Sequence, residues 1–304
     1  MNEYKVSVLV LTYNASYFDL KNTVNSVLDQ KGIDVELIIS DDGSTQCCSI
    51  NKITNYLKEI GFKNYKILTS KINEGTVKNF YRGLSHVSNE YVKSISPGDM
   101  LYGKYSLRNW LNYIIEKKAT WSFCKTIYYK NNGNDIVPIV VKAQPQSTRI
   151  YSGKNFNKMR WQYFVLGDVP VGAAILFKKS SMLSYVEEIL NKVKYAEDFI
   201  FGMAMFDGLS FCFYKKYCVL YQFGTGISTS GNNIWLMLLE KDLNEMHTIL
   251  KKRIKKEDFQ KNMLDSAVLV LESKNKFKKI FVRGYLLYKI KKLVFPRKSI
   301  SFLP

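Results

Sequence analysis

The sequence predicts an α/β protein built on a mostly parallel β-sheet flanked by helices, with a helical extension at the C-terminus. Over the first hundred residues, short apolar runs of strand length alternate with stretches that have apolar residues at helical spacing. Two of these strands end in polar residues, and from Ile234 onward the pattern is helical. We therefore expect three parts: residues 1–101, 102–232 and 233–304.

The first strand is predicted at the β-branched run that begins at Lys5 and breaks at Thr12-Tyr13-Asn14. A helix is predicted over residues 17–30, where Gly32 marks the end of the apolar periodicity. The alternation continues with strands at 35–39, 65–69 and 91–96 and with helices at 50–60 and 76–87. This order favours a parallel sheet with helices on both faces.

The pattern changes after Leu101. Here we expect a helix at 105–117, a hairpin of strands 120–129 and 136–141 at the edge of the sheet, and a basic loop at 142–160. A strand at 169–177, helices at 180–193 and 195–206, a strand at 211–220 and a small-residue loop at 225–231 follow. The second part is therefore expected to extend the same sheet.

Composition excludes several classes of protein. The 304 residues are 46% hydrophobic and 14% aromatic, which provides a sizeable core and excludes a disordered chain. No apolar run approaches the ~20 residues that span a bilayer. Residues 1–4 lack the basic and apolar regions of a signal peptide. Five cysteines, an odd number without metal-ligand spacing, fit reduced thiols in a cytoplasmic protein.

The net charge of +19 is concentrated near the C-terminus. Residues 241–304 carry 17 Lys/Arg and 6 Asp/Glu, whereas residues 1–240 carry 28 and 20. This asymmetry indicates an anionic partner, either lipid or nucleic acid, unless the tail is simply solvated. Residues 277–295 mix basic and apolar residues and could lie in the interface of an anionic membrane. Alternatively, they form a helix that packs on its own domain or on a second subunit of a homo-oligomer.

Polar residues that follow two neighbouring strands predict a pocket. In an open parallel sheet, ligands bind beyond the carboxyl ends of the strands. Tyr13 could stack on a nucleotide base, while Thr12 and Asn14 offer hydrogen bonds. A carboxylate of Asp41 or Asp42 can accept from the ring N–H of uracil or thymine, which favours a pyrimidine. The alternative is a turn whose aspartates hydrogen-bond the local backbone.

The chain resembles the nucleotide-binding half of family 2 glycosyltransferases of the GT-A type, whose fold is Rossmann-like. The resemblance is carried by four strings in order: V-S-V-L-V-L-T-Y-N from Val6, V-E-L-I-I-S-D-D-G-S-T from Val35, N-E-G-T-V-K-N-F-Y-R-G-L from Asn73 and I-S-P-G-D-M from Ile95. It is strong up to Leu101, weaker over residues 167–230 and absent beyond. It implies a bacterial sugar transferase of surface-polysaccharide assembly.

The resemblance implies that Asp42 contacts the base. Lys78 and Asn79, near the start of a helix, would suit phosphate oxygens, although they could also belong to a solvated helix face. The family usually holds a divalent metal on a D-x-D motif, and here Ser96-Pro97-Gly98-Asp99 keeps only Asp99. One carboxylate, diphosphate oxygens and water could still bind Mg²⁺ or Mn²⁺. The same residues are also typical of a type II turn.

Glu197-Asp198 matches the acidic pair that the family places at the start of a helix, where one Asp is the general base. We expect Asp198 to take the acceptor proton, Glu197 to orient it, and the helix N-terminus to keep Asp198 ionised. The alternative is a pair of ordinary acids in a first helical turn.

Two further segments resemble family features, though a purely structural role explains each equally well. Asp168 and the following residues up to Gly172 resemble the acceptor-binding wall. Residues 225–230 resemble a loop over the diphosphate, through Thr225, Ser228, Thr229 and Ser230. His86 and His247 have no predicted partner, and we expect both to be structural.

These features together predict an inverting hexosyltransferase that uses a nucleotide-sugar donor, with UDP-sugar preferred. By resemblance, its acceptor is a glycan on an undecaprenyl-diphosphate carrier, and the enzyme is peripheral at the inner face of the cell membrane, for example in capsule synthesis. One alternative is a GT-A protein that binds nucleotide sugars but has lost turnover. A nucleic-acid-binding protein is motivated by charge alone, because the sequence has no recognisable docking helix or stacking motif.

Overall fold

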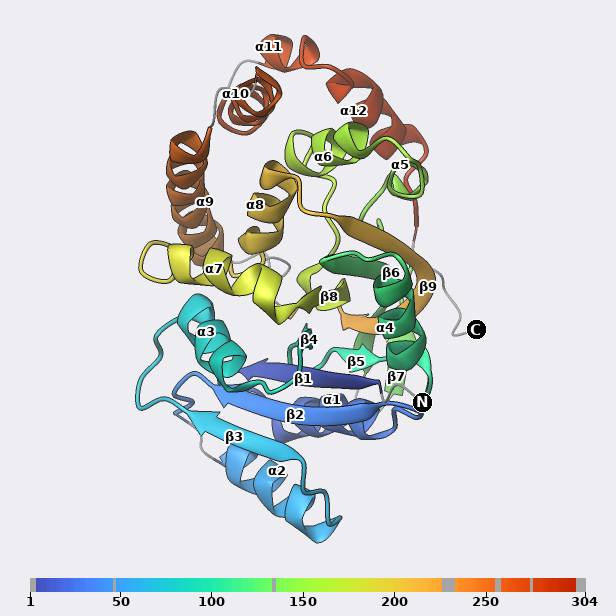
Figure 1. Cartoon of the computed structure of the whole chain (residues 1–304), viewed down its shortest axis with the longest axis vertical. Coiled ribbons are helices and arrows are strands. Elements are labelled where there is room, and N and C mark those ends of the chain that lie inside the picture. The colour runs from blue at the N-terminus through green and yellow to red at the C-terminus, as the bar shows by residue number, and fades with distance from the viewer. Residues whose placement is uncertain are drawn as a thin grey trace.

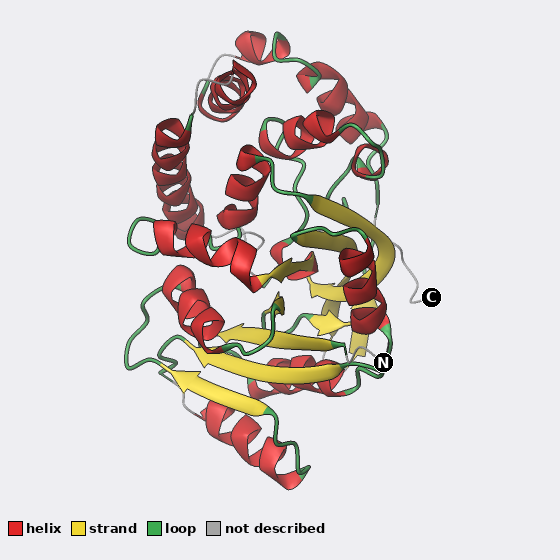
Figure 2. Cartoon of the chain, in the orientation of Figure 1, coloured by secondary structure: helices red, strands yellow, loops and turns green. Residues whose placement is uncertain are grey.

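The computed structural model describes residues 4–45, 48–132, 135–225, 233–254, 258–273 and 276–298. Within these ranges the strands form a single mixed sheet in the order β3-β2-β1-β4-β8-β6-β9-β5, and β7 pairs with β6. Helices lie on either side of the strands (Figure 2). The predicted α/β class with a flanked sheet is confirmed.

The first half contains the parallel part of the sheet. Its elements are β1 (Lys5–Thr12), α1 (Tyr17–Leu28), β2 (Asp34–Asp41), α2 (Cys48–Glu59), β3 (Tyr65–Thr69), α3 (Thr76–His86) and β4 (Tyr91–Ile95). The pairs β1–β2, β1–β4 and β2–β3 are all parallel. Successive side chains of a strand point to opposite faces. Accordingly, Leu9 packs with Phe80 of α3 in one core, and Val8 packs with Val24 of α1 in the other.

The second half extends the sheet with mixed pairing. Its elements are β5 (Met100–Leu101), α4 (Ser106–Glu116), β6 (Trp121–Asn132), β7 (Asp135–Pro138), α5 (Thr148–Tyr151), α6 (Phe156–Phe164), a 3₁₀ turn η1 (Gly172–Ala174), β8 (Ile175–Lys178), α7 (Lys179–Ile189), α8 (Phe199–Asp207) and β9 (Phe211–Gln222). β8 joins β4 in antiparallel fashion, and β6 runs antiparallel to β8 but parallel to β9.

Three expectations for this half were wrong in detail. The hairpin of β6 and β7 exists, but β6 lies inside the sheet between β8 and β9, because its apolar residues are buried on both faces. The segment 142–160 is not only loop, since it contains α5 and the start of α6. The strand expected at 169–177 begins only at Ile175, because Pro170 and the turn at Gly172 cannot join the ladder.

The C-terminal helices are α9 (Asn233–Arg253), α10 (Asp258–Glu272), α11 (Lys276–Ile280) and α12 (Tyr285–Val294). They arc around α8 and α6 of the second half (Figure 1). Met246 and Ile249 of α9 and Leu264 of α10 are buried in the same core as α7 and α8. None of the helices in the described part of the chain is long and apolar enough to cross a membrane.

Candidate active site

A cleft of about 580 Å³ lies at the carboxyl ends of β1, β2 and β4. All three parts of the chain contribute to its walls. Among its lining residues are Thr12, Tyr13, Asn14, Asp19, Asp42, Asn79, Ser96, Asp99, Gly172, Glu197, Asp198, Gln222, Thr225, Trp235 and Leu239. The position agrees with the general rule for open α/β sheets.

The end of β1 is tied to the turn after β2. Asn14 has a positive φ of 48°, which asparagine tolerates better than most residues. Its backbone N–H donates to Ser44 Oγ at 2.7 Å, and its Oδ1 accepts from the N–H of Thr45 at 2.9 Å. The neighbouring Tyr13 is 45% exposed, so its ring is accessible for stacking. Asn14 therefore fixes the two strand ends that form one wall of the cleft.

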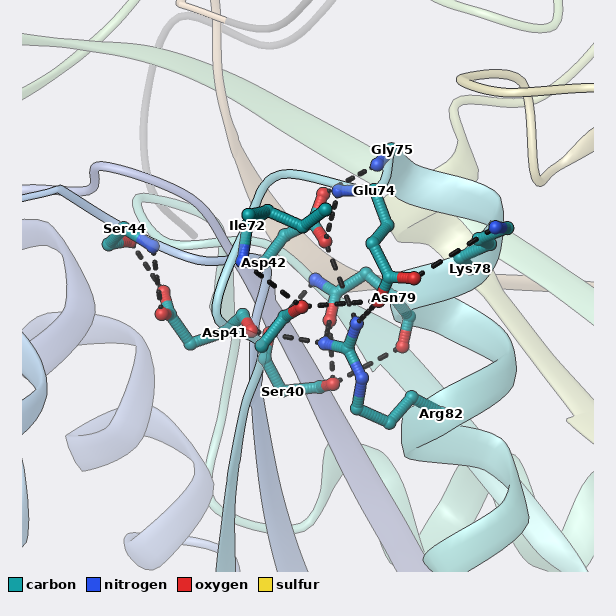
Figure 3. Close-up of polar contacts among 11 residues, drawn as sticks. Ser40, Asp41, Asp42, Ser44, Ile72, Glu74, Gly75, Lys78, Asn79 and Arg82 are labelled. Atoms are coloured by element: carbon teal, nitrogen blue, oxygen red, sulfur yellow. Dashed lines mark hydrogen bonds and ion pairs between the residues drawn. The ribbon is translucent and has the colours of Figure 1, made fainter.

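Asp41 and Asp42 point in opposite directions, as adjacent residues at a strand end do. Asp41 accepts from the N–H of Ser44 at 3.0 Å and does not line the cleft, so it has the turn-capping role that the sequence left open. Asp42 lines the cleft and accepts from the N–H groups of Glu74 at 3.1 Å and Gly75 at 2.8 Å (Figure 3). Burial raises the pKa of Asp42, and these hydrogen bonds partly offset that rise.

The turn at Gly75 brings the two halves of the chain together. A Cβ on Gly75 would lie 2.5 Å from Cγ and 2.7 Å from the carbonyl oxygen of Lys194, and its φ is 99°. Only glycine fits such a contact and such a φ. The N–H of Val77 also donates to the Lys194 carbonyl at 3.0 Å. The cleft wall formed by the first half of the chain therefore contacts the segment that precedes Glu197.

Arg82 is a residue that our sequence reasoning missed. Its guanidinium donates to Asn79 Oδ1 and to the Asp41 carbonyl, both at 3.1 Å, and also to Glu74 (Figure 3). Asn79 in turn donates to the Ser40 carbonyl at 2.9 Å. The sequence did contain a signal for Arg82, because it lies one helical turn after Asn79 and therefore on the same face of the helix.

Lys78 differs from its neighbour Asn79. Its Nζ lies 3.9 Å from Glu74 Oε1, its side chain is 44% exposed, and it does not line the cleft. This position matches a solvated helix face, which was the alternative for this residue.

Asp99 lies on the cleft wall at the end of a tight turn. The N–H of Asp99 donates to the Ser96 carbonyl at 3.0 Å, and Gly98 between them has a φ of 95°. A Cβ on Gly98 would lie 1.8 Å from Gln222 Oε1, which requires glycine there. Burial raises the pKa of Asp99 to about 7, although the Gln222 N–H at 3.0 Å and the charge of Lys93 act in the other direction.

The fit of a divalent ion rests on Asp99. Within the described ranges, no three His, Cys, Asp or Glu side chains come together as metal ligands. Asp99 nevertheless presents a buried carboxylate to the cleft, and the charge of an ion, like that of Lys93, would favour its ionised form. These residues fit an ion held by one protein carboxylate, with ligand oxygens and water completing its coordination.

Glu197 and Asp198 form the opposite wall, immediately before α8. Burial and the charge of Asp198 raise the pKa of Glu197, and burial raises that of Asp198. We expected the helix N-terminus to favour the ionised form of Asp198. The raised pKa corrects this expectation, because desolvation outweighs the effect of the helix. The two adjacent carboxyls titrate as a coupled pair, and desolvation favours the neutral form of each. A Cβ on Gly172 would lie 3.4 Å from Asp198 Oδ2, so the glycine leaves this carboxylate accessible.

The C-terminal helix α9 also builds the site, which the sequence did not predict. Asp242, only 4% exposed, accepts from three consecutive N–H groups: Lys194 at 3.0 Å, Tyr195 at 2.7 Å and Ala196 at 3.1 Å. The ring of Trp235 contacts that of Tyr195 edge-on at 5.2 Å. No sequence signal pointed to Asp242, because an acid within a long helix is usually solvated.

The remaining predicted residues divide between the cleft and other places. Thr225 lines the cleft, whereas Ser228, Thr229 and Ser230 lie outside the described residues. Asp168 is 2% exposed and does not line the cleft. It accepts from the N–H groups of Gln146 at 2.6 Å and Ser147 at 2.9 Å. His86 and His247 also lie away from the cleft.

Comparison with known proteins identifies the class. Residues 7–182 match Glycosyl transferase family 2, which is more than half of the chain. The chain belongs to the family 2 glycosyltransferases, as the four strings of its first half predicted, and the match continues through η1 and β8 into α7.

Individual relatives are distant. The chain is 24% identical over 221 residues to dTDP-rhamnosyl transferase RfbG of Shigella flexneri, covering 69% of this chain and 70% of that protein. It is 24% identical over 159 residues to an uncharacterized glycosyltransferase of Haemophilus influenzae, covering 52% of this chain and 62% of that protein.

Solved structures share the fold. TarS 1-349 of S. aureus superimposes with a TM-score of 0.62 at 16% identity, over 95% of this chain and 79% of that one. Mannosyltransferase PcManGT of Pyrobaculum calidifontis, in complex with GDP-Man and Mn²⁺, superimposes with a TM-score of 0.62 at 13% identity. The match covers 97% of this chain and 76% of that one. The predicted GT-A fold is confirmed by these likenesses.

Proposed function

We propose that the protein is an inverting glycosyltransferase that moves a hexose from a pyrimidine nucleotide-diphosphate donor to a hydroxyl group of a glycan. One observation carries this proposal. The nucleotide-side residues Tyr13, Asp42 and Asn79 line the same cleft as the acidic pair Glu197-Asp198. A donor bound along the first wall would thus present its sugar to a carboxylate on the second.

The pyrimidine assignment rests on Asp42 and Tyr13. A carboxylate can accept from the ring N–H of uracil or thymine, and an exposed tyrosine ring offers a stacking surface. The names of related proteins support this choice, since RfbG is called a dTDP-rhamnosyl transferase and TarS has been solved with UDP and with UDP-GlcNAc. We propose UDP-sugar as the donor, with dTDP-sugar as the other pyrimidine candidate.

In the proposed reaction, Asp198 accepts the proton of the acceptor hydroxyl while the hydroxyl oxygen forms a bond to the anomeric carbon. The bond from that carbon to the diphosphate oxygen breaks on the opposite face, and its electron pair leaves with the nucleoside diphosphate. The configuration at the anomeric carbon is therefore inverted. A divalent ion at Asp99 would neutralise charge that develops on the leaving diphosphate.

The acceptor and its location extend the proposal. We propose a glycan on undecaprenyl diphosphate as acceptor and the inner face of the cell membrane as location. The concentration of basic residues in the C-terminal segment supports attraction to an anionic membrane surface.

The test is a transfer assay with UDP- and dTDP-sugars on Asp198→Asn. We expect turnover to fall by about 10²–10⁴-fold, because the amide cannot accept the proton. Asp29→Asn is the matched control, since Asp29 is exposed at the end of α1 and does not line the cleft. Full activity of Asp198→Asn would remove Asp198 as the base. Absence of turnover with every donor in the wild type would favour a protein that only binds nucleotide sugars.

A further inference from the structure

A second cavity of about 560 Å³ lies between α6 and α12, formed by other residues than the cleft. Its walls combine two kinds of side chain. Trp161, Leu166 and Leu287 provide apolar surface, while Lys158, Arg283 and Lys291 supply positive charge. No ion pair to these three cations is found among the described residues. We refer to this cavity as the α6–α12 groove.

The α6–α12 groove is a fixed part of the fold. Buried Asp168 connects the two helices that form the walls of the groove. It accepts a hydrogen bond from Gln162 Nε2 of α6 at 2.9 Å and one from the Tyr288 hydroxyl of α12 at 3.3 Å. Trp161 Nε1 donates to the Arg283 carbonyl at 2.9 Å. Beyond α12, the N–H of Arg297 donates to Gln146 Oε1 at 2.7 Å. The basic C-terminal segment is therefore held against the protein.

The outer surface beside the groove is apolar and exposed. Phe281 is 89% exposed, Leu287 75%, Leu293 76% and Phe295 75%. Exposed apolar groups concentrated in this way mark an interaction surface. We call this surface, on residues 276–298 of α11, α12 and their flanks, the α11–α12 face. It lies at the opposite end of the molecule from α2 (Figure 1).

The charge of the α11–α12 face decides between partners. Residues 276–298 contain nine Lys/Arg and no Asp/Glu. A second copy of the chain would bring the same charge to a symmetric contact, which like-charge repulsion disfavours. An anionic bilayer offers the opposite charge to the lysines and an apolar interior to the exposed phenylalanine and leucine side chains.

We propose that the α11–α12 face docks on an anionic lipid bilayer and that the α6–α12 groove binds the phosphate head of a single lipid from it. The three cations of the groove would contact the phosphate. Trp161 and Leu287 would contact the first part of the lipid chain. Leu287 belongs to both surfaces, so the groove opens directly onto the docking face.

The α6–α12 groove and the active-site cleft are connected by one short stretch of chain. Asp168 lies under the groove and Gly172 lines the cleft, and four residues of extended chain span at most ~14 Å. The inference concerns lipid binding alone. It can be tested without donor or acceptor, so its failure would leave the proposed transferase function untouched.

The first experiment is co-sedimentation of the full chain with vesicles of phosphatidylglycerol and phosphatidylcholine, and with vesicles of phosphatidylcholine alone. We expect binding only to the anionic vesicles. Arg283→Glu/Lys291→Glu should weaken it by at least ~tenfold, because each reversal removes attraction and adds repulsion. The matched control, Lys58→Glu/Lys63→Glu, changes the net charge equally at exposed positions near α2 and should bind much more tightly than the groove variant.

A second variant separates apolar insertion from charge. Phe281→Ser/Leu287→Ser leaves the charge unchanged, alters two highly exposed side chains, and should also weaken vesicle binding. Equal binding to neutral vesicles would overturn the proposal, as would an equal loss in the groove variant and its control. A wild-type dimer that this serine variant converts to monomer in analytical ultracentrifugation would instead make the face a contact between copies.

The groove itself is tested by fluorescence of Trp161, with Trp161→Phe as the blank. A soluble short-chain phosphatidylglycerol should shift the emission in the wild type but not in Arg283→Glu/Lys291→Glu, and inorganic phosphate alone should have little effect. An equal response to inorganic phosphate would show a simple anion site, and no response to the lipid would show that the groove does not bind it. Either result would overturn the lipid assignment.

Discussion

Two glutamates, one in each half of the molecule, have pKa values shifted in opposite directions. Glu36 on β2 is 4% exposed and accepts from Ser7 Oγ at 2.5 Å, Ser88 N–H at 2.7 Å and Lys66 Nζ at 3.0 Å. Burial alone would raise its pKa, but these donors outweigh burial and lower it to about 2. Glu197 has Asp198 as its neighbour, and burial together with that charge raises its pKa.

The difference shows how the two halves use the same side chain. In the first half, hydrogen-bond donors lower the pKa of Glu36 to about 2, and its bonds to Ser7 of β1 and Lys66 of β3 link the three strands β1, β2 and β3. In the second half, burial raises the pKa of both Glu197 and Asp198, and the charge of Asp198 adds to the rise for Glu197. The same kind of side chain is therefore held in its ionised form in the first half and shifted toward its neutral form in the second.

Among the changes that test this comparison, the largest effect should come from Asp242, the positioning residue that holds the segment before Glu197. Asp242→Ala should lower kcat by about 10–100-fold, because small displacements of a catalytic group cost that much. Asp242→Asn, which can still accept one or two of the hydrogen bonds, should retain more activity. Steady-state kinetics over a range of pH check this, since a displaced acidic pair also shifts the acid limb of the profile.

Asp265→Ala on α10 is the control for Asp242, because its side chain is exposed and lies outside the cleft lining. It should leave kcat and the pH profile unchanged. If Asp242→Ala kept the wild-type kcat and acid limb, the helix α9 would have no positioning role.

Glu36→Gln should lower the free energy of unfolding at pH 7 by about 1.5–3 kcal/mol, the usual contribution of hydrogen bonds to a charged group. Because its folded-state pKa is lowered, the contribution of Glu36 is present above the ordinary value of 4.5 and is lost as the pH falls toward 2. Urea denaturation at several pH values should therefore show the two proteins converging in acid. A constant difference would contradict the role of the charge.

Glu197→Gln should change the free energy of unfolding in the opposite direction to Glu36→Gln and by a smaller amount. Because the folded-state pKa of Glu197 is raised, wild-type stability falls as the pH rises above the ordinary value of 4.5. The variant lacks this loss and should be more stable than the wild type by roughly 1 kcal/mol at pH 8. The same denaturation series checks it. Destabilisation by Glu197→Gln at pH 8 would mean that Glu197 is ionised and paired, like Glu36.

The sequence predicted the parts of the site that depend on local pattern. β-branched runs ending in Thr12 or in Asp41-Asp42 located the strand ends, and the carboxyl edge of a parallel sheet brings such ends together. Local pattern could not decide which of Asp41 and Asp42 faces the cleft, because this depends on the phase of the pleat.

Contacts between distant segments could not be read from the sequence. Asp242 meets residues 194–196 only because α9 packs beside α8, and Asp168 binds Tyr288, which is 120 positions away. Likewise, the interior position of β6 depends on β8 and β9, which follow it in the chain. Each of these outcomes depends on tertiary packing.

The most direct measurement is calorimetric titration of UDP and dTDP into Asp42→Ala and Asp198→Asn, with turnover measured on the same samples. If a pyrimidine nucleotide lies along the first wall with its sugar toward the second, Asp42→Ala should weaken nucleotide binding by at least ~tenfold, through loss of a charged hydrogen bond. Asp198→Asn should bind like the wild type and fail to turn over. Wild-type affinity in Asp42→Ala, or equal losses of affinity in both variants, would contradict the two-walled site.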